Sequence, residues 1–158
     1  CLILCFVTLG AYSNDPLYFS NLSLNDGLSQ ITVTSVFQDK KGYMWFGTRN
    51  GLNRFNGYNF DVFVNEPGNT RSISDNHILC ISESKEGNLW IGTNSGLNKL
   101  NTETNEFTRY FHSEGSSSSL SHNMVPSLYY DSDNNLWIGT NSGLSLSAEE
   151  YDSVIPVS

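Results

Sequence analysis

Short apolar segments alternate with turns rich in glycine, asparagine and serine along most of the chain. In the central part, the alternation of apolar and polar side chains predicts strands, and the apolar spacing does not follow the period of a helix. The expected strands cover residues 77–84, 89–93, 97–101 and 106–111. The pattern predicts an all-β fold of short antiparallel strands joined by tight turns.

A motif of tryptophan, isoleucine or phenylalanine, glycine and threonine occurs three times at nearly regular spacing. It begins at Trp45, Trp90 and Trp137, so consecutive copies lie 45 and 47 residues apart. An apolar residue followed by serine, as in Ile73-Ser74, precedes each tryptophan by 16 or 17 residues. A period near 45 residues that holds four short strands is typical of a β-propeller blade. The sequence therefore predicts about three four-stranded antiparallel blades of an incomplete β-propeller.

The phase of the repeat sets the expected boundaries of the blades. We expect blade 1 at 31–64, blade 2 at 76–111 and a partial blade 3, without its fourth strand, at 123–147. Residues 14–30 are expected to form an orphan outer strand and the loop that leads into blade 1, and residues 148–158 an irregular end. Three stacked blades leave two apolar faces open, and propellers close with about four to eight blades, so we expect the chain to be part of a longer protein.

The beginning of the chain resembles part of a secretory signal. Residues 1–10 are apolar and uncharged, and the run is too short for a membrane span of about 20 residues. Ala11-Tyr12-Ser13 supplies the small-x-small pattern of a cleavage site, so we interpret residues 1–13 as a truncated signal peptide and expect export. The alternative is a buried N-terminal strand. A lipoprotein signal is disfavoured because the bulky Leu4 precedes Cys5.

Charge and cysteine content narrow the functional classes. The chain has 16 Asp and Glu against 8 Lys and Arg, which gives a net charge of −8. This balance disfavours binding to nucleic acid or to an anionic membrane surface, since both need clustered cations.

Cys80 is the only cysteine after the first 13 residues, so it has no intrachain partner there, and its apolar neighbours favour a place in the core.

Nine repeated positions have structural interpretations. The tryptophans are expected to fill the space between adjacent blades, with stacking on a sugar as the alternative. The glycine two residues later allows close approach of the backbone, and the glycine after the next turn supplies a conformation that other residues resist. These positions are Trp45, Gly47, Gly51, Trp90, Gly92, Gly96, Trp137, Gly139 and Gly143.

Groups suited to catalysis or metal binding are sparse. His112 and His122 flank a serine-rich loop and would need a third ligand, such as Glu114, to hold a metal. The carboxylates of 131–135 have the alternate spacing of a calcium loop, but glycine at its sixth position and an acidic twelfth residue are missing, so a polar hairpin turn is favoured. The recognised hydrolase and phosphate-binding motifs do not occur. We expect no catalytic residue, metal site or cofactor in this chain.

The best candidates for ligand binding lie in the connections at one rim of the blades. These are the turns between the second and third strands and the loops between blades. Arginine there could meet a carboxylate or sulfate, and asparagine could bind hydroxyl groups. The candidates are Arg49, Asn50, Arg71, Asn94 and Asn141, and the alternative is that they are ordinary turn residues.

These motifs resemble the two-component regulator propeller repeat. Asn88-Leu89-Trp90-Ile91-Gly92-Thr93, followed by Gly96-Leu97, is a close match, and the copy that begins at Asn135 is similar. Copy one departs from the pattern at Tyr43-Met44 and at Phe46. The resemblance covers about residues 17–146, and the early segment 24–29 is similar to the start of such proteins after their signal peptide.

The resemblance implies a non-enzymatic sensory role. Such propellers form the periplasmic half of bacterial hybrid sensor histidine kinases, whose parent protein is anchored in the inner membrane. Many respond to oligosaccharides, so the implied partners are an oligosaccharide, the remaining blades of the parent and a second parent subunit in a homodimer. Three alternatives stay open: a propeller lyase or hydrolase, a structural or protein-interaction propeller, and an inactive truncated remnant.

Overall fold

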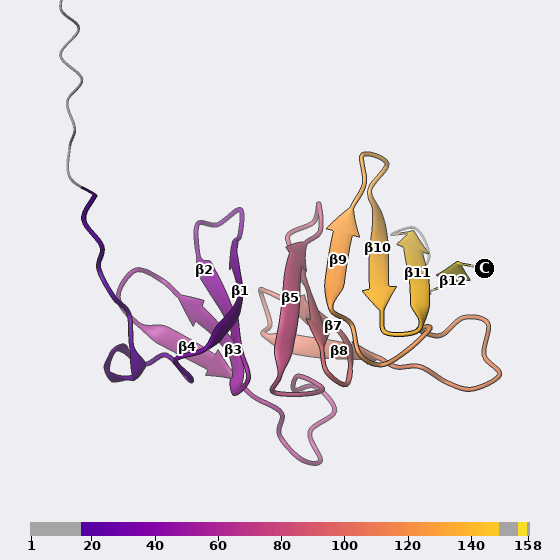
Figure 1. Cartoon of the computed structure of the whole chain (residues 1–158), viewed down its shortest axis with the longest axis horizontal. Helices are drawn as coiled ribbons and strands as arrows, with labels where there is room; N and C mark the ends of the chain where they lie inside the picture. The colour runs from indigo at the N-terminus through magenta and orange to yellow at the C-terminus, as the bar shows by residue number, and fades with distance from the viewer. Residues whose placement is uncertain (1–16, 149–154, 158) are drawn as a thin grey trace, which may run out of the picture.

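Three separate antiparallel sheets form the molecule in the computed structural model, which describes residues 17–148 and 155–157 (Figure 1). In each sheet the strands pair in chain order, as a meander. The first sheet holds β1 (Val33–Gln38), β2 (Met44–Thr48), β3 (Gly51–Phe55) and β4 (Phe60–Phe63); the second holds β5 (Ile78–Glu83), β6 (Leu89–Thr93), β7 (Gly96–Asn101) and β8 (Glu106–Tyr110); the third holds β9 (Ser127–Tyr130), β10 (Asn135–Thr140), β11 (Gly143–Ala148) and β12 (Ile155–Val157). The prediction of an all-β fold of repeated four-stranded units is confirmed.

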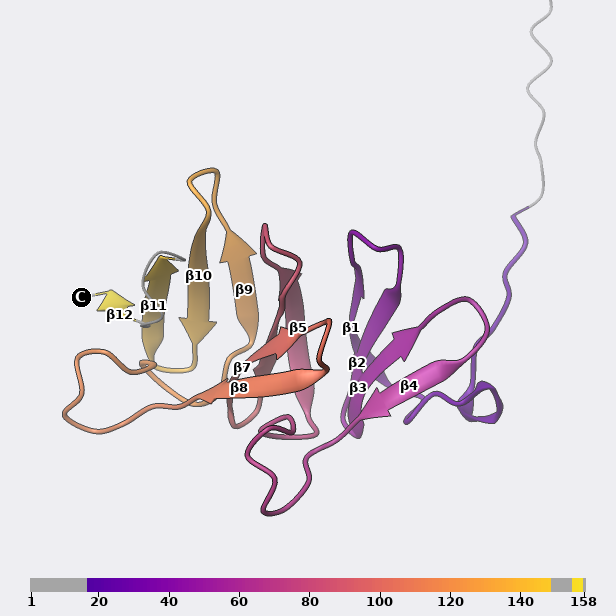
Figure 2. The same ribbon diagram turned by 180° about the vertical axis from the view of Figure 1, so that it is seen from behind.

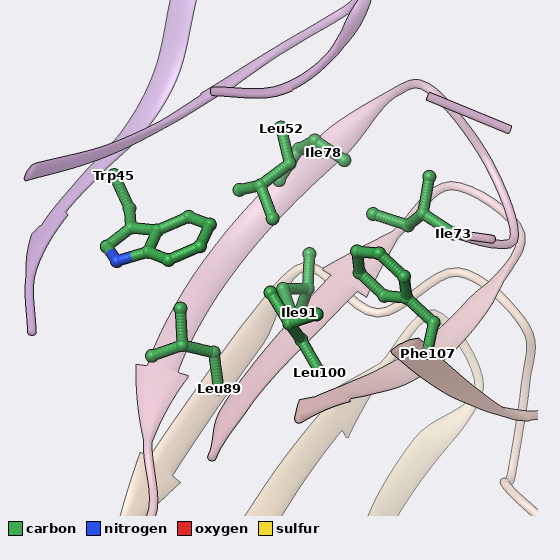
Figure 3. Packing of buried hydrophobic residues seen from close by; sticks show 8 residues of the cluster. All are labelled: Trp45, Leu52, Ile73, Ile78, Leu89, Ile91, Leu100 and Phe107. Atoms are coloured by element: carbon green, nitrogen blue, oxygen red, sulfur yellow. The ribbon is translucent and has the colours of Figure 1, made fainter. Parts of the chain in front are cut away.

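The sheets stack face to face, and the strands β1, β5 and β9 lie side by side (Figure 1). Two apolar clusters fill the spaces between adjacent sheets. Between the first and second sheets, Trp45 and Leu52 are fully buried against Leu89 and Ile91 (Figure 3). Between the second and third sheets, Trp90 is 4% exposed and packs in the same cluster as Leu136 and others. The stacking of sheets therefore supplies the core, because each blade alone has no closed interior.

The repeated glycines in the second strands allow this close stacking. A Cβ atom on Gly92 would lie 2.3 Å from the carbonyl oxygen of Val125, which precedes the third sheet. A Cβ atom on Gly47 would lie 2.7 Å from a methyl group of Ile78 in the second sheet. Any larger residue at these two positions would push neighbouring blades apart.

The tryptophans of blades 1 and 3 are oriented by the turn between the first two strands. The indole nitrogen of Trp45 donates to Asp39 at 2.8 Å, and that of Trp137 donates to Asp131 at 2.7 Å. Blade 2 has Ser84 at the equivalent position, and Trp90 Nε1 is buried without a hydrogen-bond partner in the described part of the chain. Trp45 and Trp90 are thus enclosed between blades, which leaves their faces out of reach of a sugar.

The described residues at the two ends of the repeat differ from the expected pattern. Residues 17–23 form no strand, and the next ordered element is the 3-10 helix η1 (Leu24–Asp26). An outer strand at 18–22 would need the open edge of a third strand, but β4, β8 and β12 already occupy those edges. Residues 155–157 are not irregular: β12 pairs with β11 and completes blade 3. Pro156 is tolerated there because an edge strand does not need every N–H group.

The predicted truncated signal peptide at residues 1–13 lies outside the described residues. Among the described residues, no helix is long and apolar enough to cross a membrane.

Candidate functional site

The turns between the second and third strands of the three blades lie at one rim of the stack, together with the loops that join one blade to the next (Figure 1). We use the name loop rim for the three turns alone, which are 49–50, 94–95 and 141–142. Each turn is closed by the threonine at the equivalent position of its own repeat. The hydroxyl of Thr93 donates to the carbonyl oxygen of Gly96 at 2.7 Å and accepts from the N–H of Ser95 at 3.2 Å. Gly96 has φ of 114°, which a residue with a side chain rarely adopts.

A polar residue in the third strand ties each turn to the apolar-serine pair that leads into the blade. Asn98 is fully buried, and its Oδ1 accepts from the N–H of Ser74 at 2.8 Å. Asn53 accepts from Ser29 at 2.9 Å in blade 1, and Ser145 accepts from Ser121 at 3.0 Å in blade 3. The repeated serine therefore anchors the loop rim to the sheet. Sequence reasoning found the repeated serines but not their buried partners, which occur eight residues after each tryptophan.

Four of the predicted binding residues lie on the loop rim. Arg49, Asn50, Asn94 and Asn141 are all exposed in the turns. The side chain of Asn50 donates to the carbonyl oxygen of Ser29 at 3.3 Å, so its orientation is partly fixed. The backbone N–H groups of Asn94 and Asn141 donate to the preceding loops, which holds the turns while their amide side chains face solvent. This edge presents amides and one guanidinium group, which suit a hydroxyl-rich or anionic ligand.

Arg71 lies away from these turns. Its guanidinium group pairs with Glu106 at 2.7 Å, and its carbonyl oxygen accepts from the N–H of Phe107 at 2.9 Å. Glu106 is opposite Asn101 in the sheet, five residues along β7 from Gly96. At a rise of about 3.3 Å per residue this is about 17 Å from the turn at 94–95. The structure therefore places Arg71 on the outer surface, beside a cleft of about 140 Å³ between β4 and β8.

The loop that contains Arg71 is held by a residue that sequence reasoning missed. Arg109 of β8 donates from Nε to the carbonyl oxygen of Ser72 at 2.6 Å. From Nη2 it donates to the carbonyl oxygens of Asn69 and Ile73 and to the Ser72 hydroxyl. The available signal was that Arg109 has no cationic counterpart in the other two copies, where Val62 and Pro156 stand.

The histidines and the acidic hairpin have local structural roles. His112 Nδ1 is 2.6 Å from the carbonyl oxygen of Leu120, and His122 Nδ1 accepts from the N–H of Met124 at 3.0 Å. Both oxygens of Asp131 accept hydrogen bonds from its own turn and from Trp137. Within the described residues, no group of three or more His, Cys, Asp or Glu side chains is placed to hold a metal ion.

The shifted pKa values of these groups follow from their local hydrogen bonds, ion pairs and burial. The hydrogen bond to the N–H of Asn135, followed by that from Trp137, lowers the pKa of Asp131 below its ordinary value. The pairing of Lys41 with Glu103 raises the pKa of the lysine and lowers that of the glutamate. Burial raises the pKa of Cys80 to about 12, so this thiol stays protonated near neutral pH, and it contacts the carbonyl oxygen of Val125 at 3.3 Å.

Stacked four-stranded meanders, with the first strands side by side and tryptophans between the sheets, define blades of the β-propeller class. The two-component regulator propeller family model matches residues 27–50, 72–95 and 119–142, one segment in each blade. The chain is built of two-component regulator propeller repeats, which confirms the resemblance carried by its motifs.

Individual relatives extend this result. The chain is 45% identical to histidine kinase P4 of Formosa agariphila over 61 residues. These residues make up 39% of this chain and 4% of that protein. It is also similar to the extracellular domain of a putative hybrid two-component system from B. thetaiotaomicron, with 28% identity and a TM-score of 0.80 over 87% of this chain and 20% of that one. The chain therefore spans a small part of the proteins that it matches.

A lyase shares the fold at greater distance. Virginiamycin B lyase from Staphylococcus aureus has 16% identity and a TM-score of 0.54 over 79% of this chain and 41% of that one. This likeness is one of fold alone.

Proposed function

We propose that this chain is the ligand-sensing propeller segment of a hybrid two-component signalling protein, and that its ligand is an oligosaccharide bound at the loop rim. The observation that carries the proposal is the likeness, at a TM-score of 0.80, to an extracellular domain of a putative hybrid two-component system. The segment is periplasmic in this proposal, and the parent protein is a homodimer anchored in the inner membrane. The parent supplies the remaining blades and the histidine kinase, and this segment performs no catalysis.

The chemistry of the loop rim supports a sugar ligand. Exposed amides at Asn94 and Asn141 can donate to and accept from hydroxyl groups, and Arg49 can form paired hydrogen bonds with a sugar carboxylate or sulfate. The turns are fixed by Thr93 and its counterparts, so binding orders little backbone. A bound ligand signals if it favours one arrangement of the parent dimer over another. A propeller lyase is not favoured, because the likeness to such an enzyme is one of fold alone.

The test is calorimetry of the whole exported region encoded by the gene against a panel of neutral, carboxylated and sulfated oligosaccharides. We expect one class to bind, with Asn94→Ala weakening it, and Arg49→Gln weakening an anionic ligand about tenfold. Arg71→Gln is the matched control, because Arg71 pairs with Glu106 on the outer surface and its loss should leave affinity unchanged. Failure of every oligosaccharide to bind, or equal loss in the control, would contradict the proposal.

A further inference from the structure

The two loops that join successive blades share a set of internal hydrogen bonds. We call residues 65–73 the first loop and residues 112–120 the second loop. Asn65 N–H donates to Asn76 Oδ1 at 2.6 Å, and His112 N–H donates to Asn123 Oδ1 at the same distance, 2.6 Å. The hydroxyl of Ser72 accepts from Glu66 N–H at 2.9 Å, and that of Ser119 accepts from Ser113 N–H at 3.0 Å. The second loop therefore repeats the internal bonds of the first.

The equivalence extends to the oxygens that hold Arg109. In the first loop the Ser72 hydroxyl donates to the carbonyl oxygen of Asn69 at 3.1 Å, and in the second loop the Ser119 hydroxyl donates to that of Ser116 at 3.2 Å. The side chain of Asn65 donates to the carbonyl oxygen of Ile73 at 2.7 Å. In the second loop the equivalent contact is between Nδ1 of His112 and the carbonyl oxygen of Leu120, at 2.6 Å. In the second loop, the oxygens equivalent to those bound by Arg109 are the carbonyls of Ser116, Ser119 and Leu120 and the hydroxyl of Ser119.

Among the described residues, the first loop binds a guanidinium group and the second loop does not. Arg109 is opposite Asn98 in the sheet of blade 2, and the residue at that register in blade 3 is Pro156, opposite Ser145. Proline has no donor to offer. The exposure of the loops differs accordingly: Ser72 is 7% exposed beneath Arg109, whereas Ser119 is half-buried and residues 112–118 are exposed. In both views the second loop projects at the edge of the molecule (Figures 1 and 2).

We infer that the second loop is a binding site for the guanidinium group of an arginine side chain supplied by a partner polypeptide. The four oxygens accept a planar fork of N–H donors in the way that the first loop accepts Arg109. An ammonium group is a poorer fit, because it cannot reach carbonyls on both sides of the serine in one plane. Glu114, exposed on the same loop, adds a negative charge that favours a cationic partner. This site is separate from the turns proposed to bind a sugar.

The test is a titration of the ¹⁵N-labelled full chain with Nα-acetyl-arginine methylamide, followed by two-dimensional NMR. We expect the amide signals of Ser116, Ser119 and Leu120 to shift, with a dissociation constant on the order of millimolar, and the lysine analogue to shift them far less. Ser119→Ala removes one acceptor and should weaken binding about tenfold. Ser117→Ala, in the same exposed run, is the matched control and should leave binding unchanged.

A second variant keeps the test decisive if Ser119→Ala disturbs the loop. Pro156→Arg places a guanidinium group at the register of Arg109, and we expect it to fill the second loop and abolish binding of the added arginine. Loop signals that move on concentrating the protein alone would identify a second copy as the source of the arginine. Equal shifts with the arginine and lysine analogues, or full binding in Pro156→Arg, would overturn the inference.

Discussion

The unpaired indole of blade 2 allows a stabilising substitution to be designed. Trp90 is 4% exposed, and its Nε1 is buried without an acceptor in the described part of the chain. The equivalent tryptophans donate to Asp39 and Asp131, which stand six residues before them, where blade 2 has Ser84. Ser84→Asp therefore places a carboxylate where the other two blades have one.

The expected gain follows from the hydrogen bonds made and lost. A hydrogen bond to a charged group contributes about 1.5–3 kcal/mol net. Against this stand the loss of the Ser84 hydroxyl bond to Glu86, at 2.9 Å, and repulsion between the new carboxylate and Glu86. We expect Ser84→Asp to raise the free energy of unfolding by about 1 kcal/mol, or the midpoint temperature by about 2–4 °C.

The assay is urea unfolding of the full chain, followed by tryptophan fluorescence. Ser84→Asn is the control for charge, because its amide oxygen can accept from the indole without repelling Glu86. Asp39→Ser makes the reverse change in blade 1 and should cost about 2–3 kcal/mol, since it removes the acceptor of Trp45 and of the turn. If both substitutions at Ser84 leave stability unchanged or lower it, the reasoning about the unpaired indole is wrong.

Three further predictions concern packing, the first loop and pH. Gly92→Ala should lower the free energy of unfolding in urea by about 3 kcal/mol, because its Cβ would meet Val125. Gly57→Ala has open space around it and φ of 97°, so it should lower that free energy by only about 1 kcal/mol. Equal costs would contradict the packing account. Arg109→Lys keeps the charge but loses the fork, so hydrogen exchange in the loop at 65–73 should accelerate about tenfold or more, and unchanged protection would refute this. The pKa of Asp131 is lowered in the folded chain, so the stabilisation by its carboxylate is complete above the ordinary value of 3.8 and is lost as pH falls through the folded-state pKa. The difference in unfolding free energy between the native chain and Asp131→Asn should therefore shrink below pH 3.8. A constant difference would exclude this role.

The blades could be predicted from the sequence because each repeats the same local requirements. The second strand of blade 2 was expected at 89–93, which is where β6 lies. Tryptophan and glycine recur two residues apart because adjacent sheets approach closely at that point, as Gly92 shows against Val125. Such constraints are local in the sequence and identical in every copy, so alignment of the copies reveals them.

The features that sequence reasoning missed depend on contacts between distant residues. Arg71 was expected on the loop rim, but its loop is drawn onto β8 by Arg109, which lies 37 residues beyond Ser72. β12 follows its partner strand at a different spacing and contains Pro156, so the pattern of the copies does not show it. Residues that break the repeat, rather than those that keep it, therefore indicate where the blades differ.

The measurement that tests the sensor account most directly is the DNA sequence of the gene on both sides of the segment that encodes this chain. The account predicts that the reading frame continues past Ser158 into further repeats with the tryptophan-glycine motif, then a membrane span and a histidine kinase. A reading frame that stops after Ser158, with no such module encoded nearby, would contradict it.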